Sequence, residues 1–145
     1  MNTFVLDASV AVKWAIPFSS EPLSSESAKL LRGYVDGEID FIVPDLFWAE
    51  VGNVFWKGAR LRRWTRDLAE AAASDIGDCK FTTVSSQALL PDALKIAFAH
   101  DCSVYDCLYV ALAIQFKIQM ITADERLANA LAARLPVKWL GALVI

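Results

Sequence analysis

Apolar and polar residues alternate along the chain in two kinds of pattern, which together predict strands separated by helices. Short apolar runs are typical of buried strands, and longer stretches with apolar residues three and four positions apart are typical of helices. The expected strands are residues 3–6, 39–43, 118–122 and 137–140, with a weaker one at 81–84. The expected helices are residues 9–16, 24–36, 45–60, 65–79, 86–99, 104–117 and 125–134. A surface loop is expected at 17–25, PFSSEPLSS.

The alternation of strands and helices predicts an α/β fold. Parallel strands joined through helices are covered on both faces, so we expect a three-layer α/β/α sandwich with a mostly parallel central sheet. No linker divides the chain, and its 145 residues suit a single domain, residues 1–145. Ligands of such sheets gather at the carboxyl ends of the strands.

Composition narrows the class of protein without changing this fold. The chain is 56% hydrophobic with a mean hydropathy of +0.39, yet no uncharged apolar stretch approaches the roughly 18 residues of a membrane span. Asp7 and Lys13 interrupt the first apolar stretch, and no basic segment leads into it, so we expect a cytoplasmic protein with no membrane contact.

The cysteines and the histidine do not suggest a zinc site. Cys79, Cys102 and Cys107 lack C-x-x-C spacing, and His100 is the one histidine. Free cysteines are commonly buried. We therefore expect three buried, reduced thiols.

The net charge of −3 argues against a surface coated with basic residues, but one basic strip stands out. KGARLRRWTR, residues 57–66, places five cations around one tryptophan. A solvated helix end explains such a strip as well as an RNA-contacting surface with a stacking aromatic does. On the second interpretation, the RNA-binding candidates are Arg60, Arg62, Arg63 and Trp64.

Two of the expected strands run directly into an aspartate. FVLD ends at Asp7, and MITAD ends at Asp124. A buried carboxylate without a partner is costly, so each aspartate must cap a helix, reach solvent or hold a cation. Thr122 and Glu125 have the T-x-x-E spacing of a capping box, which would leave Asp124 free of that role. At Asp7 the interpretations remain open.

Two further acids lie at helix positions near expected strand ends. Glu50, in PDLFWAEVGNVFWKGAR, is on the flank of a helix face that carries Phe47 and Val54. Asp106, in SVYDCLYVALAIQF, lies three residues after Ser103, the S-x-x-D spacing of a capping pair. The helix that follows is apolar almost all round from 108 to 116 and is expected to be buried, so Asp106 would face the sheet edge.

Each acid alone has an ordinary structural explanation, but four acids at one sheet edge would form a negative pocket. Like charges so close repel one another unless protons or a cation bind. Oxygen ligands suit Mg²⁺ or Mn²⁺ better than zinc. Such a cation activates water and stabilises charge on a phosphoryl oxygen, which allows a phosphodiester to be cut without a histidine or a covalent nucleophile.

The segments FVLDASV, FWAEVGNVFWK, SVYDCLYVALA and MITADERLANAL resemble, in order and over nearly the full length, the four motif blocks of PIN-domain ribonucleases. The likeness is greatest to VapC-like toxins of toxin–antitoxin systems. The resemblance implies that an acidic tetrad binds Mg²⁺ or Mn²⁺ and hydrolyses RNA, and that Ser9 lies near the metal. It also implies a homodimer and a small VapB-like antitoxin that fills a groove beside the active site. The residues matching the tetrad are Asp7, Glu50, Asp106 and Asp124.

Three other interpretations differ in the chemistry that they require. A phosphotransferase of the haloacid dehalogenase type needs D-x-D, where this chain has Asp7-Ala8-Ser9. A receiver-like signalling module would find a phosphoacceptor in Asp45 but needs an acidic pair after the first strand, which is missing. A catalytically silent PIN-like module that only binds RNA or protein remains an alternative. Metal-dependent cleavage would distinguish the enzyme from it.

Overall fold

The computed structural model describes residues 2–15 and 22–144, and its centre is a sheet of five parallel strands. Across the sheet the strand order is β3-β2-β1-β4-β5. The predicted strands are confirmed, and every pairing between them is parallel. They are β1 (Asn2–Leu6), β2 (Ile39–Pro44), β3 (Thr82–Val84), β4 (Gln119–Thr122) and β5 (Val137–Trp139).

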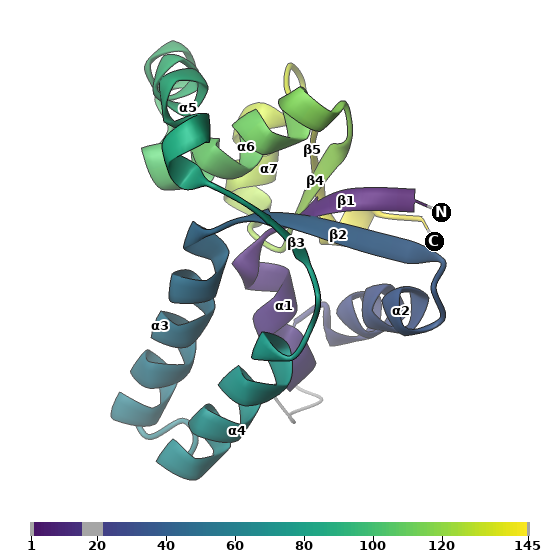
Figure 1. Ribbon diagram of the computed structural model, residues 1–145, viewed down its shortest axis with the longest axis vertical. Coiled ribbons are helices and arrows are strands. Elements are labelled where there is room, and N and C mark those ends of the chain that lie inside the picture. The colour runs from purple at the N-terminus through teal and green to yellow at the C-terminus, as the bar shows by residue number, and fades with distance from the viewer. Residues whose placement is uncertain (1, 16–21, 145) are drawn as a thin grey trace.

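Helices cover both faces of this sheet (Figure 1), so the predicted three-layer α/β/α arrangement is confirmed. The first layer holds α1 (Ala8–Ala15), α2 (Ser24–Val35), α3 (Leu46–Arg60) and α4 (Arg66–Gly77). The opposite layer holds α5 (Ser86–His100), α6 (Val104–Phe116) and α7 (Glu125–Leu131), and a 3₁₀ turn, η1 (Leu140–Ala142), follows β5. The predicted helices are all present, although α7 ends three residues earlier than expected. Residue 16 of the first predicted helix and residues 17–21 of the predicted loop lie outside the described residues.

The order of the strands creates a switch point between β1 and β4. From β1 the chain adds β2 and β3 on one side, and then returns to the other side of β1 to add β4 and β5. Because crossovers between parallel strands are right-handed, reversing direction moves the connecting helices to the opposite face. The loops after β1 and β4 therefore part from each other, and this is where such sheets form a ligand crevice.

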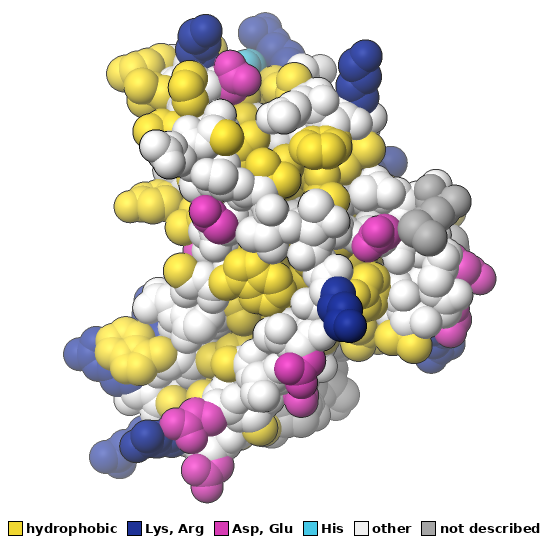
Figure 2. All heavy atoms as spheres, viewed as in Figure 1, with side chains coloured by type: hydrophobic (Ala, Val, Ile, Leu, Met, Phe, Trp, Pro, Cys, Tyr) yellow, Lys and Arg dark blue, Asp and Glu magenta, His cyan; other side chains and the backbone are white. Residues whose placement is uncertain are grey.

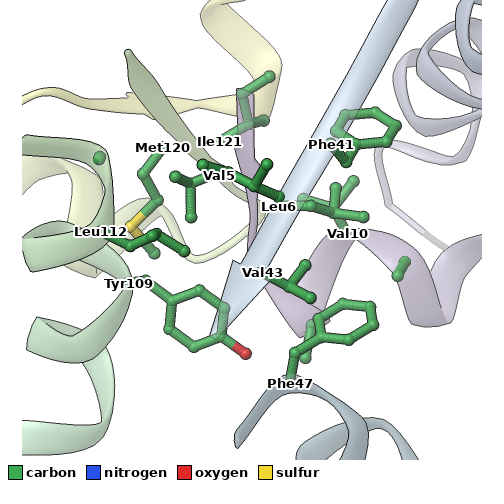
Figure 3. Close-up of a cluster of buried hydrophobic side chains, with 14 of the residues drawn as sticks. Val5, Leu6, Val10, Phe41, Val43, Phe47, Tyr109, Leu112, Met120 and Ile121 are labelled. Carbon is green, nitrogen blue, oxygen red and sulfur yellow. The ribbon is translucent and has the colours of Figure 1, made fainter. Parts of the chain in front are cut away.

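The core fills both faces of the sheet (Figure 3). On the α6 side, Tyr109, Leu112 and Met120 are fully buried, and on the other side Phe41 and Phe47 are fully buried. Five aromatic rings surround the Phe81 ring, with centroid distances of 5.2–6.2 Å. These rings are Trp14, Tyr34, Phe41, Phe47 and Trp48.

Burial along α6 differs in part from the sequence prediction. Residues 107–113 are all buried, as expected. Ile114 and Phe116 are instead 45% and 46% exposed. The last turn leads into the exposed cap Lys117, where the chain turns towards β4, so this turn lies at the margin of the layer. The expectation of burial to the end of the helix was wrong.

The three cysteines are free thiols, but only one is buried. Cys107 lies in the core, whereas Cys79 and Cys102 are partly exposed. The expectation of three buried thiols is therefore correct for Cys107 alone.

Within the described ranges, no one helix has both the length and the apolar character needed to cross a membrane. The bent pair α5 and α6, with an angle of 113° between them, reaches that length and composition only when the two are joined.

Candidate active site

The end of β1 places Asp7 at the switch point of the sheet. Its backbone N–H donates to the carbonyl of Ile121 at 3.1 Å, so Asp7 continues the ladder between β1 and β4 by one residue. Its side chain is only 7% exposed. The strand that ends on a charge thus brings this carboxylate into the body of the protein.

Two hydroxyl groups hold the Asp7 carboxylate. Ser9 Oγ donates to Asp7 Oδ2 at 2.6 Å, and Thr122 Oγ1 donates to the same oxygen at 2.8 Å. Among the described residues, Oδ1 has no hydrogen-bond partner. Asp7 therefore does not cap α1 with its side chain, and one of its oxygens remains available to a ligand.

Burial makes the Asp7 carboxyl a weaker acid than usual. Its pKa rises from 3.8 to about 6, chiefly because burial disfavours the charged form. The bonds from Ser9 and Thr122 lower the pKa, while the charges of Glu50 and Asp106 raise it further. No described cation contributes to this shift, so a metal ion would supply the missing positive charge.

Glu50 reaches the same region from the first turns of α3. Its carboxylate is half-buried, and its Oε1 accepts a hydrogen bond of 2.6 Å from the hydroxyl of Tyr109. Burial raises the Glu50 pKa, the Tyr109 bond opposes this rise, and the charge of Asp106 adds to it. The charge of Glu50 thus raises the Asp7 pKa, and the charge of Asp106 raises the Glu50 pKa.

Asp106 lies in the first turn of α6, where Ser103 caps the helix by accepting the Asp106 N–H at 3.2 Å. Of the predicted S-x-x-D capping pair, the hydrogen bond to the serine is therefore confirmed. Burial raises the Asp106 pKa, and the charge of Asp124 raises it further. Each of the four predicted acids therefore interacts electrostatically with at least one other.

Asp124 departs from the sequence prediction because it does cap its helix. Its Oδ1 accepts the N–H of Leu127 at 3.1 Å at the start of α7. The expected cap, Thr122, is buried and turned towards Asp7, and its Oγ1 accepts the Asp124 N–H at 3.0 Å. The capping-box interpretation was wrong, since a contact distant in sequence already engages the threonine.

The donor set fits a hard divalent cation in chemistry but does not form a closed cage. The four acids offer only oxygen ligands, which Mg²⁺ and Mn²⁺ prefer. As the side chains stand, no group of three or more His, Cys, Asp or Glu among the described residues is arranged to hold a metal ion. Mg²⁺ is usually held by one or two carboxylates together with water and substrate phosphate. An open site centred on Asp7 matches that pattern.

An open hollow of about 320 Å³ lies beside two of the acids. Asp106 and Asp124 line it together with Ser103, His100 and Arg126. No sequence pattern connects His100 or Arg126 with the acids. A larger hollow of about 490 Å³ lies between α3 and α4, and none of the four acids lines it.

The predicted basic strip is only partly arranged as expected. Arg60, Arg62 and Arg63 are exposed around the end of α3, and Figure 2 shows Lys and Arg side chains gathered on this part of the surface, at the lower left. Trp64 is instead partly buried, donates from Nε1 to the Phe55 carbonyl at 2.9 Å and packs against α3. Its role as a free stacking aromatic is therefore not supported.

The exposed aromatic of this region is Trp56. It is 56% exposed, and the guanidinium of Arg60 lies 5.3 Å from its ring centroid. Nothing in the local sequence indicated that Trp56, within a regular helix, faces outwards. The exposed aromatic side chain of this region therefore lies on α3, eight residues before Trp64.

Two residues that contact the acids were missed in the sequence. Thr122 was interpreted only as a helix cap, and Tyr109 was interpreted only as one apolar residue of a buried helix. The available signal for Tyr109 was its position one turn after Asp106, on the same helix face. A buried phenol also needs a hydrogen-bond partner.

Comparisons with known proteins agree with the fold. The family model of the PIN domain matches residues 4–131. Ribonuclease VapC3 of Pyrobaculum aerophilum is 37% identical over 87 residues, which are 59% of this chain and 66% of that protein. The matched region thus spans slightly less than two thirds of this curated relative.

Two solved structures resemble the fold. PAE2754 from Pyrobaculum aerophilum matches with a TM-score of 0.68 and 22% identity, covering 89% of this chain and 79% of its own. A toxin–antitoxin complex from Klebsiella pneumoniae matches with a TM-score of 0.58 and 14% identity, covering 93% and 95%. At these identities the two structures bear on the fold alone.

Proposed function

This chain belongs to the PIN domain family, and from this premise we propose that it is a metal-dependent endoribonuclease, the toxin of a toxin–antitoxin pair. The observation that carries the proposal is the electrostatic coupling of four acids from separate elements near the switch point, together with the Asp7 Oδ1 atom, which accepts no hydrogen bond from the described residues. The likeness to Ribonuclease VapC3 supports RNA as the substrate.

In this proposal Asp7, Glu50, Asp106 and Asp124 hold Mg²⁺ or Mn²⁺. The cation, when bound, supplies a Lewis acid for the scissile phosphate and lowers the pKa of water. Ser9 and Thr122 hold Asp7 by Oδ2 and so keep Oδ1 directed to the ligand. Water attacks phosphorus, the bond from phosphorus to the leaving sugar oxygen breaks, and that oxygen takes up a proton.

The partners proposed are RNA, a VapB-like antitoxin and a second copy of the chain in a homodimer, in the cytoplasm. The proposal of an antitoxin partner is supported by the similarity in fold to the toxin–antitoxin complex from Klebsiella pneumoniae. A catalytically silent module that only binds RNA or protein is the competing outcome, and cleavage assays separate the two.

The largest expected effect is the loss of cleavage in Asp7→Asn. Removing a partner that only orients a metal ligand commonly lowers metal affinity or activity 10–100-fold, so we expect at least about 100-fold for the buried ligand itself. Purified wild type and variant are incubated with total RNA in Mn²⁺ or EDTA, and new RNA ends are mapped. Wild-type cleavage in EDTA, or by folded Asp7→Asn at the wild-type rate, would contradict the proposal.

We further propose that the exposed arginines at the end of α3 contact RNA phosphates. The double variant Arg62→Gln and Arg63→Gln should bind single-stranded RNA more weakly, with a salt slope flatter by about 1.4, or about 0.7 for each lost contact. Binding is measured in the Asp7→Asn background to prevent cleavage. Arg32→Gln with Arg134→Gln, two exposed arginines outside the strip, is the matched control. Equal slopes in both double variants would leave the strip a solvated helix end.

A further inference from the structure

Tyr109 carries a polar group into the most buried part of α6. Its side chain has no exposed surface, and its neighbours Cys107, Leu108 and Val110 are buried apolar residues. A phenylalanine would fill the same space with the same apolar contacts. The hydroxyl is therefore the part of Tyr109 that packing does not explain.

That hydroxyl is directed at Glu50. It donates to Glu50 Oε1 at 2.6 Å, a distance typical of an O–H group bonded to an ionised carboxylate. Figure 3 shows the phenol oxygen pointing away from α6, towards Val43 of β2 and Phe47 of α3. The bond thus joins the two helical layers across the carboxyl edge of the sheet.

The sequence places this donor beside another acid of the site. Asp106 precedes Tyr109 by three residues, so both lie on one face of α6. One rigid, buried helix therefore supplies an acid and also holds a second acid that belongs to α3. Glu50 has three rotatable side-chain bonds, and without a partner it would turn towards water and away from like charges.

We propose that Tyr109 is a positioning residue: its hydroxyl fixes Glu50 Oε1 and thereby presents Oε2 to the cation. This inference rests on the metal site of the proposed function. The arrangement parallels that of Asp7, where protein hydroxyls bond to Oδ2, while Oδ1 accepts no hydrogen bond from the part of the chain that the structure describes.

The test is the Mn²⁺ affinity of Tyr109→Phe, measured by titration calorimetry without RNA. The variant keeps the ring and removes only the donor, so the fold should persist and Mn²⁺ binding should weaken by about 10-fold, as for other residues that orient metal ligands. Tyr34→Phe is the matched control, because it removes a hydroxyl that accepts the Lys80 N–H at 3.3 Å in a different cluster. Its Mn²⁺ affinity should equal that of the wild type.

Two further variants separate positioning from packing. Replacing Tyr109 with 4-aminophenylalanine retains a donor at the ring end and should restore most of the affinity. In a Glu50→Gln background, Tyr109→Phe should change Mn²⁺ affinity by less than about 2-fold, since the group it positions has lost its charge.

The possible outcomes test the inference about Tyr109 and the proposed function separately. Mn²⁺ binding by Tyr109→Phe equal to that of the wild type, an undiminished effect in Glu50→Gln, or loss of the fold in Tyr109→Phe would overturn the inference. A wild type that binds no Mn²⁺ and cleaves no RNA would instead overturn the proposed function.

Discussion

The ends of β1 and β4 carry the same sequence pattern and lie side by side, yet their aspartates have different surroundings. Asp7 is buried and accepts two hydroxyl bonds on one oxygen. Asp124 is exposed and accepts a backbone N–H of α7. The Asp7 carboxylate is held by side chains of α1 and β4, whereas the Asp124 carboxylate is held by the helix that follows it.

The difference arises from register. Leu6 pairs with Ile121, so the residue beside Asp7 on β4 is Thr122, and Asp124 lies two positions further on. Asp7 thus completes the ladder, whereas Asp124 has already left it. An apolar run followed by aspartate therefore indicates which edge an acid occupies, but pairing with the neighbouring strand determines whether it is buried.

The largest expected effect of this contrast on stability is in the pH dependence of the unfolding free energy of the metal-free protein. Between pH 3.8 and about 6, folded Asp7 keeps a proton that the unfolded chain releases, so the unfolding free energy falls as pH rises through this window. A shift of this size is worth about 3 kcal/mol. In EDTA, Asp7→Asn should match the wild type near pH 4 and exceed it by about 1–3 kcal/mol at pH 7 in denaturant melts.

The matched control is Asp124→Asn. Asparagine retains most of the capping ability of aspartate, and Asp124 is exposed, so its unfolding free energy should stay within about 0.5 kcal/mol of the wild type. If both variants gained stability equally at pH 7, the contrast between a buried and a capping aspartate would be wrong.

Mn²⁺ should stabilise the wild type by an amount that depends on Asp7. A ligand that binds only the folded state at a hundredfold excess over its dissociation constant adds about 2.7 kcal/mol. Asp7→Asn should lose most of this gain in thermal melts with and without Mn²⁺, and Asp124→Asn should lose a smaller part because it keeps the buried carboxylate. A full gain in Asp7→Asn would place the metal elsewhere.

The smallest expected effect is on the unfolding free energy, and it distinguishes the helix-capping role of Asp124 from metal binding. Asp124→Ala should cost about 0.5–2 kcal/mol of unfolding free energy, with or without metal, because the Leu127 N–H loses its acceptor. Asp124→Asn keeps an acceptor for that N–H, so in EDTA it should not show this loss. Chemical denaturation in EDTA measures both variants. Equal losses in Asp124→Ala and Asp124→Asn would mean that the loss does not come from the cap.

The sequence was sufficient to predict the strands and helices and the edge of the sheet on which the acids lie. Apolar runs and helical spacing depend on local burial, and they placed every strand and helix within a few residues of its observed bounds. The same local rules failed at Thr122, because the T-x-x-E spacing does not reveal that Asp7 already engages the threonine from another strand.

Side-chain orientation was the other limit of the sequence. Trp64 lies in a basic, polar segment but is held against α3 by its bond to Phe55, whereas Trp56 lies within a regular helix and faces outwards. Tyr109 looked like part of an apolar helix because its partner Glu50 is 59 residues away. Each error involves a tertiary contact that no local pattern encodes.

The bond between Thr122 and Asp7 spans 115 residues of chain, which has a consequence for when the site exists during synthesis. A ribosome adding about 5–20 residues per second needs roughly 6–23 s to travel from Asp7 to Thr122. Until β4 emerges and docks, β1 has an open flank and Asp7 lacks one of its two hydroxyl partners. A nascent chain of this protein therefore holds three of the acids before it holds the fourth, and β4, which emerges just before the fourth acid, also completes the central pairing of the sheet.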